Sequence, residues 1–377
     1  MKKIFNLILV ILVVFVLFGC GEKYTITFDV NGGNELENNQ IEVVYGEVIE
    51  LPVPTKNNSI FLGWYYDNKE VSNIGDINSD AILVAKWISV YEENGKSYID
   101  LGKYPQSLVT DVDLINKLNN ITATNSLGYI EYEGKEYKKV VAAPFISGYT
   151  FMNDSQIIEG NTYYFNVEPI KWRVLQESDG IYKLLSEYIL DNTEFYKYFN
   201  DRIVDEKTIC PNNYEYSNIR AWLNGYNGSS YNVDDYTNKG FLDVAFNNKE
   251  KNIINTALVD NSAISTSKYN NKYVCNNTND KIYPLSYHEA QSSKYELGER
   301  NAKVSDYARS KGCYMEMMYD SMGNANRFYG DGIWCLRSPG TTEPIFVCAV
   351  NGTIFDEYLG AHNAGFGIRP ALEITIK

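Results

Sequence analysis

The N-terminal end of this 377-residue chain constrains the rest most strongly, because two lysines precede a mostly apolar stretch from Ile4 to Phe18. A small residue and then Cys20 follow this stretch. A helix needs about 20 apolar residues to cross the hydrocarbon core of a bilayer, and this stretch is shorter. A positive start, a short apolar middle and a small residue near the end are the parts of a secretory signal peptide. The pattern predicts that residues 1–19 are a signal peptide removed on export.

The residues from Leu17 to Cys20 resemble the lipobox at the cleavage site of bacterial lipoproteins. The resemblance implies that Cys20 is lipidated and becomes the N-terminus of the mature protein. Residues 20–23 would then form the lipid anchor and a tether that spans about 10 Å at full extension. We therefore expect a lipid-anchored protein on the extracellular face of the bacterial cell membrane, with the membrane as one partner.

Composition narrows the class of the exported part. Charged residues make up 22% and aromatic residues 14%, which is typical of a globular chain. A formal net charge of −14 disfavours nucleic acid as a partner. Tyrosine is unusually common, with 32 residues against 16 phenylalanines. A tyrosine-rich surface suits the binding of an extracellular protein or a glycan, although half-buried strands would use the same residue.

The cysteines and histidines show no metal-binding pattern. Five cysteines follow Cys20 without a C-x-x-C pair, and the chain has only two histidines. A structural zinc site normally uses four such ligands, often at close spacing. The segment from Asp76 to Asp80 begins like a calcium loop but lacks the turn glycine and the final glutamate. Neither histidine lies in a nucleophile motif, so we expect no metal, no cofactor and no catalytic residue.

Residues 24–87 have the patterns of a small β domain. Tyr24, Ile26, Phe28 and Val30 alternate with polar residues, and an Asn-Gly-Gly turn follows them. The same reasoning predicts the other strands of this domain. They are expected at residues 41–45, 47–51, 60–66 and 81–87.

Four motifs in this segment resemble the internalin-type B repeat of bacterial surface proteins. In order they are TFDVNGG, VVYGEVIELPVPT, FLGWYYD and ILVAKW. The resemblance implies a small β-grasp-like module that serves as a stalk or an adhesive module. Acidic residues outnumber basic ones within the segment, ten to three, so we expect it to be repelled by an anionic bilayer.

Residues 88–97 are expected to be a linker, and residues 98–377 to form one larger α+β domain. Helices are predicted from Ser217, through residues 241–254 and from Ser305 to Gly312. Asp179-Gly180 between two alternating runs predicts a hairpin. Further strands are expected in the C-terminal third, at residues 332–338, 345–350 and 368–376.

Six separated motifs in residues 98–377 resemble an uncharacterised bacterial extracellular domain with W-x-L-R-S-P-G and G-x-R-P-A-L signatures. They are LGKYPQS, EPIKWRVL, YSNIRAWLNG, IYPLSYHEA, GIWCLRSPG and GFGIRPALEI. The resemblance implies a C-type-lectin-like mixed domain, related to the fold of the formylglycine-generating enzyme. Such a domain would present a ligand-binding surface.

The two signatures contain Arg337 and Arg369, which could clamp a ligand. Trp222 and Trp334 could likewise offer stacking surfaces. A structural role is favoured for all four, since a strand-end arginine often ties loops together and a tryptophan often anchors a core. Both interpretations remain open from the sequence.

Cys335 and Cys348 are predicted to form a disulfide. If Ser338 pairs with Ile345 in a hairpin, the two cysteines lie directly opposite each other, with β-carbons about 4.5–5.5 Å apart. The bond would fix the intervening loop, residues 339–344, as a rim of a ligand surface. The alternative to a structural disulfide is that the two cysteines serve a copper or thiol oxidase, because the formylglycine-generating relatives hold copper with two cysteines.

The sequence as a whole predicts a lipid-anchored surface protein for binding or adhesion. A B-repeat stalk would carry a lectin-like domain whose ligand is an extracellular protein or a glycan. An oxidase related to the formylglycine-generating enzyme is the alternative function.

Overall fold

The computed structural model describes residues 22–67, 69–266, 275–295, 297–340, 345–355 and 360–376. Cys20, and residues 341–344 of the predicted rim loop, lie outside the described residues. The chain forms two compact units, which we call the small unit and the large unit. The small unit contains the residues up to Asn57 and Phe61–Trp87, and the large unit contains Asn58–Ile60 and Ile88–Lys377.

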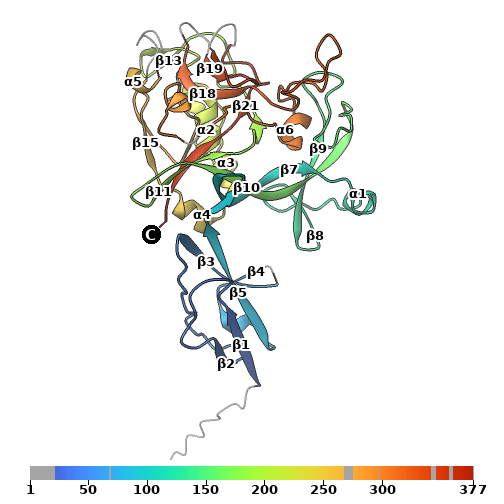
Figure 1. Cartoon of the computed structure of the whole chain (residues 1–377), viewed down its shortest axis with the longest axis vertical. Helices are drawn as coiled ribbons and strands as arrows, with labels where there is room; N and C mark the ends of the chain where they lie inside the picture. The colour runs from blue at the N-terminus through green and yellow to red at the C-terminus, as the bar shows by residue number, and fades with distance from the viewer. Residues whose placement is uncertain are drawn as a thin grey trace, which may run out of the picture. The chain divides into compact units, whose positions relative to one another are not determined.

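The small unit is built on one five-stranded sheet (Figure 1). Its strands are β1 (Lys23–Asp29), β2 (Gln40–Val44), β3 (Ser59–Tyr66), β4 (Lys69–Val71) and β5 (Ala81–Ser89). Their order is β2-β1-β5-β3-β4, and a short 3-10 helix, η1 (Ile74–Asp76), precedes β5. The central pair β1 and β5 is parallel, whereas β1 and β2 are antiparallel. The two central strands therefore come from opposite ends of the unit.

Alternation along the strands builds the core of the small unit. Ile26 and Phe28 of β1 are buried together with Leu83 and Ala85 of β5, while the side chains between them are more exposed. The ring of Trp64, from β3, lies 4.8 Å from the ring of Phe28, centroid to centroid. One face of the sheet thus supplies the core, as the period of two requires.

The strand predicted at residues 47–51 does not form. Ile49 and Leu51 still pack against the core, from an irregular segment. Pro52 and Pro54 cannot donate to a sheet ladder, which disfavours a further strand here. Burial of apolar side chains therefore does not require the backbone to be paired.

The large unit contains an eight-stranded sheet around two long strands, which Figure 1 labels β7 and β10. Its strands are β6 (Tyr91–Glu93), β7 (Lys96–Leu108), β8 (Ile130–Tyr132), β9 (Lys135–Val141), β10 (Thr162–Ser178), β11 (Ile181–Ser186), β17 (Ile282–Tyr283) and β22 (Ala371–Thr375). The main path runs β17-β22-β11-β10-β7-β6, and β9 pairs with both β10 and β8. The C-terminal strand β22 is therefore an internal strand of this sheet.

A second sheet, of five strands, holds the C-terminal motifs. Its strands are β12 (Asp191–Asn192), β18 (Trp334–Pro339), β19 (Ile345–Cys348), β20 (Ile354–Phe355) and β21 (Gly367–Ile368), in the order β12-β21-β18-β19-β20. Two two-stranded sheets complete the strands, namely β13 (Arg202–Val204) with β14 (Lys207–Ile209) and β15 (Ala257–Val259) with β16 (Thr278–Asp280). The strand predicted at residues 368–376 is split between two sheets, because Arg369 and Pro370 separate β21 from β22.

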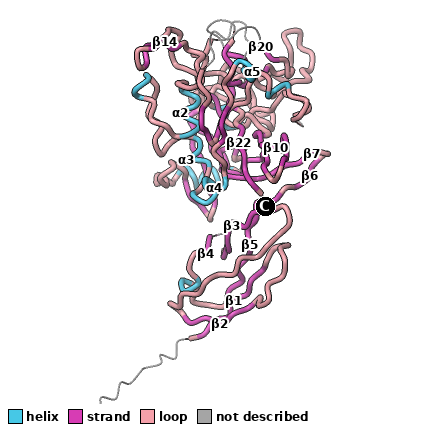
Figure 2. The backbone as a smooth tube through the Cα atoms, turned by 90° about the vertical axis from the view of Figure 1, so that its left-hand side faces the viewer, coloured by secondary structure: helices cyan, strands magenta, loops and turns pink. Residues whose placement is uncertain are grey.

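The helices of the large unit are short, and Figure 2 shows that strands and loops make up most of it. The α-helices are α1 (Val112–Asn119), α2 (Asn218–Asn224), α3 (Phe241–Ala245), α4 (Asn248–Ile253), α5 (Ala263–Thr266) and α6 (Asp306–Ser310). The 3-10 helices are η2 (Ser229–Tyr231) and η3 (Glu289–Gln291). The chain is thus mainly β with few helices, compatible with the predicted α+β class. No helix in the described part of the chain is long and apolar enough to cross a membrane.

Capping residues explain where the helices begin and end. Ser217 accepts a hydrogen bond from the Arg220 amide at 3.1 Å, so α2 begins where it was predicted. Ser305 caps α6 in the same way. The single helix predicted over residues 241–254 is instead two, because Asn247 forms a capping box with Glu250 and starts a new helix after α3.

The predicted hairpin at Asp179-Gly180 is confirmed. It joins β10 to β11, with Ser178 opposite Ile181. Asp179 and Gly180 have φ angles of 53° and 76°, as a two-residue type I′ turn requires.

Residues 88–97 are not a free linker, contrary to the prediction. Tyr91 and Tyr98 pair across a turn at Asn94-Gly95, so β6 and the start of β7 form a hairpin in the large sheet. Asn-Gly is a strong signal for such a turn, and here it adds these residues to the large unit.

Candidate ligand-binding site

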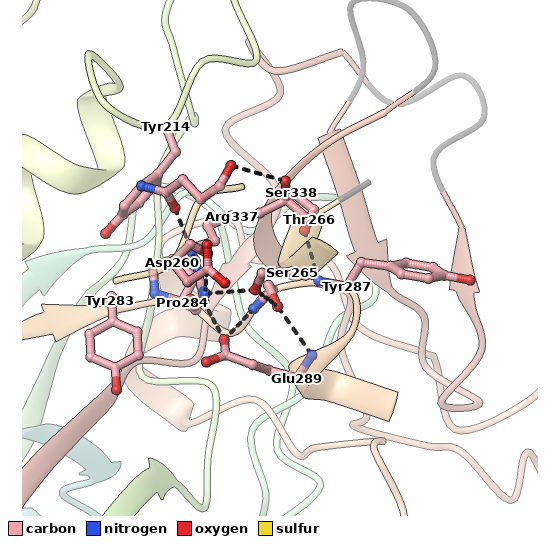
Figure 3. Close-up of polar contacts among 12 residues, drawn as sticks. Tyr214, Asp260, Ser265, Thr266, Tyr283, Pro284, Tyr287, Glu289, Arg337 and Ser338 are labelled. Carbon is pink, nitrogen blue, oxygen red and sulfur yellow. Dashed lines mark hydrogen bonds and ion pairs between the residues drawn. The ribbon is translucent and has the colours of Figure 1, made fainter. Parts of the chain in front are cut away.

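Arg337 lies within β18 and is the centre of a buried polar network (Figure 3). Its side chain is 1% exposed, and its guanidinium donates to acceptors from two segments of the chain, residues 260–265 and 284–289. The acceptors are Asn261 Oδ1 (3.2 Å), Pro284 O (2.9 Å), Asp260 O (3.0 Å), Ser265 Oγ (3.4 Å) and the carboxylate of Glu289. The neighbouring Ser338 hydroxyl accepts from the Tyr287 amide at 2.7 Å. Arg337 therefore ties loops together and is engaged on every nitrogen of its guanidinium.

The electrostatics of this network depend on Glu289. Burial alone would raise the pKa of the Glu289 carboxyl, but Arg337 and Lys183 outweigh burial and lower it to about 2. Lys183 Nζ lies 3.2 Å from Glu289 and 3.3 Å from Glu373. The carboxylate is thus held ionised between two cations, which is what a buried charge requires.

Three of the residues singled out from the sequence meet at one backbone atom, the carbonyl oxygen of Arg300. Trp334 Nε1 donates to it at 3.1 Å and Arg369 Nη1 at 3.3 Å, and Cys348 Sγ lies 3.7 Å away. Arg369 also donates from Nε to Ser186 O at 2.8 Å, and its guanidinium lies 5.2 Å from the Trp334 ring centroid. These side chains are buried and position the segment that contains Arg300.

Arg369 carries an unusual feature for a buried cation. Its Nη2 atom has no hydrogen-bond partner within the described residues. Burial and, to a smaller extent, the nearby Arg173 lower the pKa of its guanidinium to about 10. Arg369 and Arg173 thus repel each other, and the Glu187 carboxylate offsets part of this repulsion.

The predicted disulfide is wrong for this structure, because the hairpin has a different register. Trp334 lies opposite Cys348, and Cys335 lies opposite Val347. Residues opposite each other share a face, so the two cysteines point to opposite faces of the sheet. Both are free and buried, and burial raises the pKa of each thiol.

Arg300 lines a pocket of about 480 Å³. It is lined by Gly298, Glu299, Arg300, Asn301, Arg327, Phe328, Asn351 and Gly352. Arg300 Nε donates to Gly352 O at 2.7 Å, while its two terminal nitrogens make no hydrogen bond to a described residue. Arg327 is exposed, and its guanidinium lies 4.5 Å from the Phe328 ring centroid without an ion pair to a described residue. We call this the Arg300–Arg327 pocket.

A smaller hollow of about 230 Å³ adjoins this pocket and shares Glu299 and Asn301 with it. Lys96, Arg173 and Lys303 line it, together with Glu187 and Asp331. Across the two hollows, five cationic side chains face three carboxylates. This surface has a net positive charge, on a chain whose formal net charge is −14. The contrast favours an anionic group as the ligand.

Trp222, the remaining residue singled out from the sequence, is half-buried on α2. Its ring packs 5.5 Å from the ring of Phe241, centroid to centroid. It does not line the Arg300–Arg327 pocket. Within the described residues, no group of three or more histidine, cysteine, aspartate or glutamate side chains is arranged to hold a metal ion.

Comparison with protein families matches residues 179–376 to a domain of unknown function, DUF6273. This match covers more than half of the chain. The chain belongs to the DUF6273 family. All eight lining residues of the Arg300–Arg327 pocket lie inside the DUF6273 domain, as do Arg337 and Arg369. The long strands β7 and β10 both precede the matched segment, so the compact large unit extends beyond it.

Residues 24–86 match the Listeria-Bacteroides repeat domain. Together with the DUF6273 domain, this repeat is consistent with a bacterial surface protein. A protein of Evansella cellulosilytica, described as a Gly-rich membrane protein, is 36% identical over 88 residues, which cover 20% of this chain. The match spans only 10% of that protein's length. No solved structure matches the chain.

Sequence reasoning missed Arg300 and Arg327, which are the arginines that line the pocket. Neither lies in one of the quoted motifs, and no local pattern distinguishes them from other surface residues. A signal existed only for two residues that hold the backbone of Arg300, namely Trp334 and Arg369 inside the C-terminal signatures. Apart from the half-buried Trp222, the residues that are conspicuous in the sequence are buried, and the candidate binding residues lie in loops.

Proposed function

We propose that this protein is a lipid-anchored cell-surface binding protein. In this proposal the Listeria-Bacteroides repeat is the membrane-proximal stalk, and the large unit is a lectin-like binding domain. The Arg300–Arg327 pocket is the ligand site. The ligand is an extracellular glycan or protein.

The location rests on the sequence and on the family matches. The resemblance of residues 17–20 to a lipobox supports an anchor at Cys20, with three residues between it and Tyr24, where the strand pattern begins. The repeat domain and the relative described as a membrane protein support a surface or membrane-associated location. The order β2-β1-β5-β3-β4, with a parallel central pair, is compatible with a β-grasp-like stalk module.

The binding function rests on one observation, which is the state of the two arginines in the pocket. Both guanidinium groups face the same pocket, and neither forms an ion pair with a described residue. The other arginines singled out, Arg337 and Arg369, are buried and donate to protein acceptors. Arginine with unused donors in a concave site is well suited to recognise an anionic or polar ligand.

No observation favours the oxidase alternative. Cys335 and Cys348 lie on opposite faces of a hairpin, and burial disfavours the thiolate form that thiol chemistry needs. The geometry offers no pair of adjacent reactive thiols from these two residues.

Binding is tested on cells that display the full-length protein. Such cells, exposed to panels of immobilised glycans and extracellular proteins, should bind at least one panel member, and Arg327→Ala should lose that binding. Lys207→Ala is the matched control, because it also removes one exposed positive charge from the large unit, at the start of β14. Equal binding of wild-type and Arg327→Ala cells to every panel member would contradict the proposed site.

The anchor is tested by fractionation. Cys20→Ala should abolish metabolic labelling with a radioactive fatty acid and release the protein from the membrane fraction. Full membrane retention of Cys20→Ala, with residues 1–19 still attached, would show an ordinary membrane helix in place of a lipid anchor.

A further inference from the structure

We infer that the Arg300–Arg327 pocket binds a sugar residue that carries a carboxylate, so that the ligand of this protein is an acidic glycan. The inference rests on the proposed binding function and specifies its ligand class.

The first step is the fixed orientation of Arg300. Its carbonyl oxygen accepts from Trp334 and Arg369, and its Nε donates to Gly352 O. Gly352 has a φ of 78°, a conformation that glycine adopts without strain. The turn that presents the Gly352 carbonyl to Arg300 therefore has no backbone strain at this position. The terminal nitrogens of Arg300 are left as an oriented pair of donors. A planar guanidinium in this state can hold a carboxylate through two parallel hydrogen bonds.

The second step is the charge of the pocket. Arg300 and Arg327 contribute two positive charges to the lining, and Glu299 contributes one negative charge. The remaining lining residues are neutral, which leaves one uncompensated positive charge. A monoanion such as a carboxylate matches that charge, whereas a phosphate monoester near neutral pH carries nearly two negative charges and would also meet Glu299.

The third step is the polarity of the lining. Asn351 uses Oδ1 to accept from the Thr353 amide, and its Nδ2 has no described partner. Asn301 uses Nδ2 to donate to Asp331, and its Oδ1 has no described partner. One donor and one acceptor are thus available for hydroxyl groups. Phe328 is the one large apolar side chain among the described lining residues, so the pocket suits a polyhydroxylated ring better than an apolar side chain of a peptide.

Anionic lipids are the nearest competing source of negatively charged groups. A membrane of anionic lipids would present many negative charges to a chain with a formal net charge of −14. Repulsion over the whole surface opposes that approach, while a single acidic sugar entering a locally positive pocket avoids it. The volume of about 480 Å³ also lies in the range of small-molecule sites.

The test measures affinity for three probes, which are a galacturonate trisaccharide, a hyaluronan tetrasaccharide and sialyl-lactose. Each is compared with its carboxyl-reduced form, in which a neutral CH2OH group replaces the carboxylate. The full-length protein is used in detergent micelles at low ionic strength. At least one acidic probe should bind, and its reduced form should bind at least tenfold more weakly, which corresponds to about 1.4 kcal/mol.

The variants locate the binding. Arg327→Ala should weaken the acidic probe at least tenfold, and Arg300→Lys should weaken it too, because lysine cannot form the two parallel hydrogen bonds. The affinity of Lys207→Ala for the acidic probe should stay within about twofold of the wild-type affinity. Arg300→Lys is also checked for a native thermal transition, and the exposed Arg327→Ala keeps the test valid if Arg300→Lys does not fold.

The outcomes separate this inference from the proposed function. If no acidic probe binds, or if acidic and reduced forms bind equally, the inference that the ligand is a carboxylate-bearing sugar is wrong. The binding function survives that result if displayed cells still bind another panel member through Arg327. Binding of a glutamate-rich peptide through Arg327 in place of the sugars would overturn the glycan class alone. Binding of the acidic sugar that is unchanged in both arginine variants would place the site elsewhere and overturn the assignment to this pocket.

Discussion

The two units of this chain bury different kinds of residue. The buried core of the small unit consists of apolar side chains such as Ile26, Trp64 and Leu83. Every buried polar or charged residue within the described part of the chain belongs to the large unit, including Arg309 and Arg337. The small unit is built on one sheet, whereas the large unit combines several sheets and short helices with many loops (Figure 2). The comparison indicates that a loop-rich domain needs buried polar side chains in addition to an apolar core.

The buried arginines of the large unit donate mainly to backbone carbonyls of loops. Arg309 donates to Val304 O at 2.9 Å and to Thr150 O at 3.0 Å. Arg202 donates to Tyr231 O at 3.0 Å and to Tyr216 O at 2.6 Å. Loops do not satisfy their own carbonyls as sheets do, and an unsatisfied buried carbonyl is costly. A guanidinium with five N–H groups satisfies several of them at once.

The largest loss of stability is expected from Arg337→Met. The substitution leaves the Glu289 carboxylate in the interior without its closest partner, and removal of one member of a buried ion pair costs about 3–5 kcal/mol. Hydrogen exchange by mass spectrometry on the full chain should show loss of protection in the segments near residues 260–266 and 284–289. Unchanged protection there would mean that the network does not hold these loops.

A slightly smaller effect is expected from Leu83→Ala in the small unit. Leu83 is fully buried, and removing its side chain leaves a cavity that costs about 3 kcal/mol. Exchange should accelerate in β1 and β5 while protection of the large unit stays as in the wild type. Loss of protection in both units together would show that they unfold as one, against the division drawn between them.

Acid should destabilise the large unit selectively. The pKa of Glu289 is lowered to about 2 from 4.5, so its stabilising contribution is complete above pH 4.5 and is lost as the pH falls toward 2. At about pH 3.5 the loss from this one group is about 1 kcal/mol. Urea unfolding of the large unit, monitored by hydrogen exchange, gives the free energy of unfolding at each pH. Between pH 4.5 and pH 2 this free energy should fall more steeply for the wild type than for Glu289→Gln. Parallel declines would show that another group controls the acid response.

The smallest effect on stability is expected from Arg327→Ala, the exposed counterpart of Arg337→Met. Its guanidinium is in solvent and forms no ion pair with a described residue, so the change in unfolding free energy should stay within about 0.5 kcal/mol. Thermal unfolding of the full chain measures it. A loss as large as that of Arg337→Met would make Arg327 a structural residue and would weaken its assignment to a ligand site.

Local patterns predicted the small unit and the local elements of the large unit well. Alternation placed Ile26 and Phe28 in the core, Asp179-Gly180 gave the correct hairpin, and Ser217 gave the correct helix start. Patterns failed where two local signals competed. The apolar series over residues 241–254 indicated one helix, but the cap at Asn247 divided it.

The candidate site could not be predicted in the same way. Its two arginines belong to loops, and their meeting depends on the packing of β18, β21 and the segments that follow Gly298 and Asn326. The register of the β18–β19 hairpin was also beyond local reasoning. A shift of one residue from the predicted pairing moved Cys335 and Cys348 to opposite faces.

The sequence by itself determined the order of the modules, the strand alternation of the small unit and the caps and tight turns of the large unit. Each of these depends on interactions within a few residues, which residue type and spacing fix directly. Only the tertiary structure decided which arginines are buried and which remain available. That choice is set by contacts such as those of Arg337 with residues 48 and 77 positions away in the sequence, and no local rule contains them.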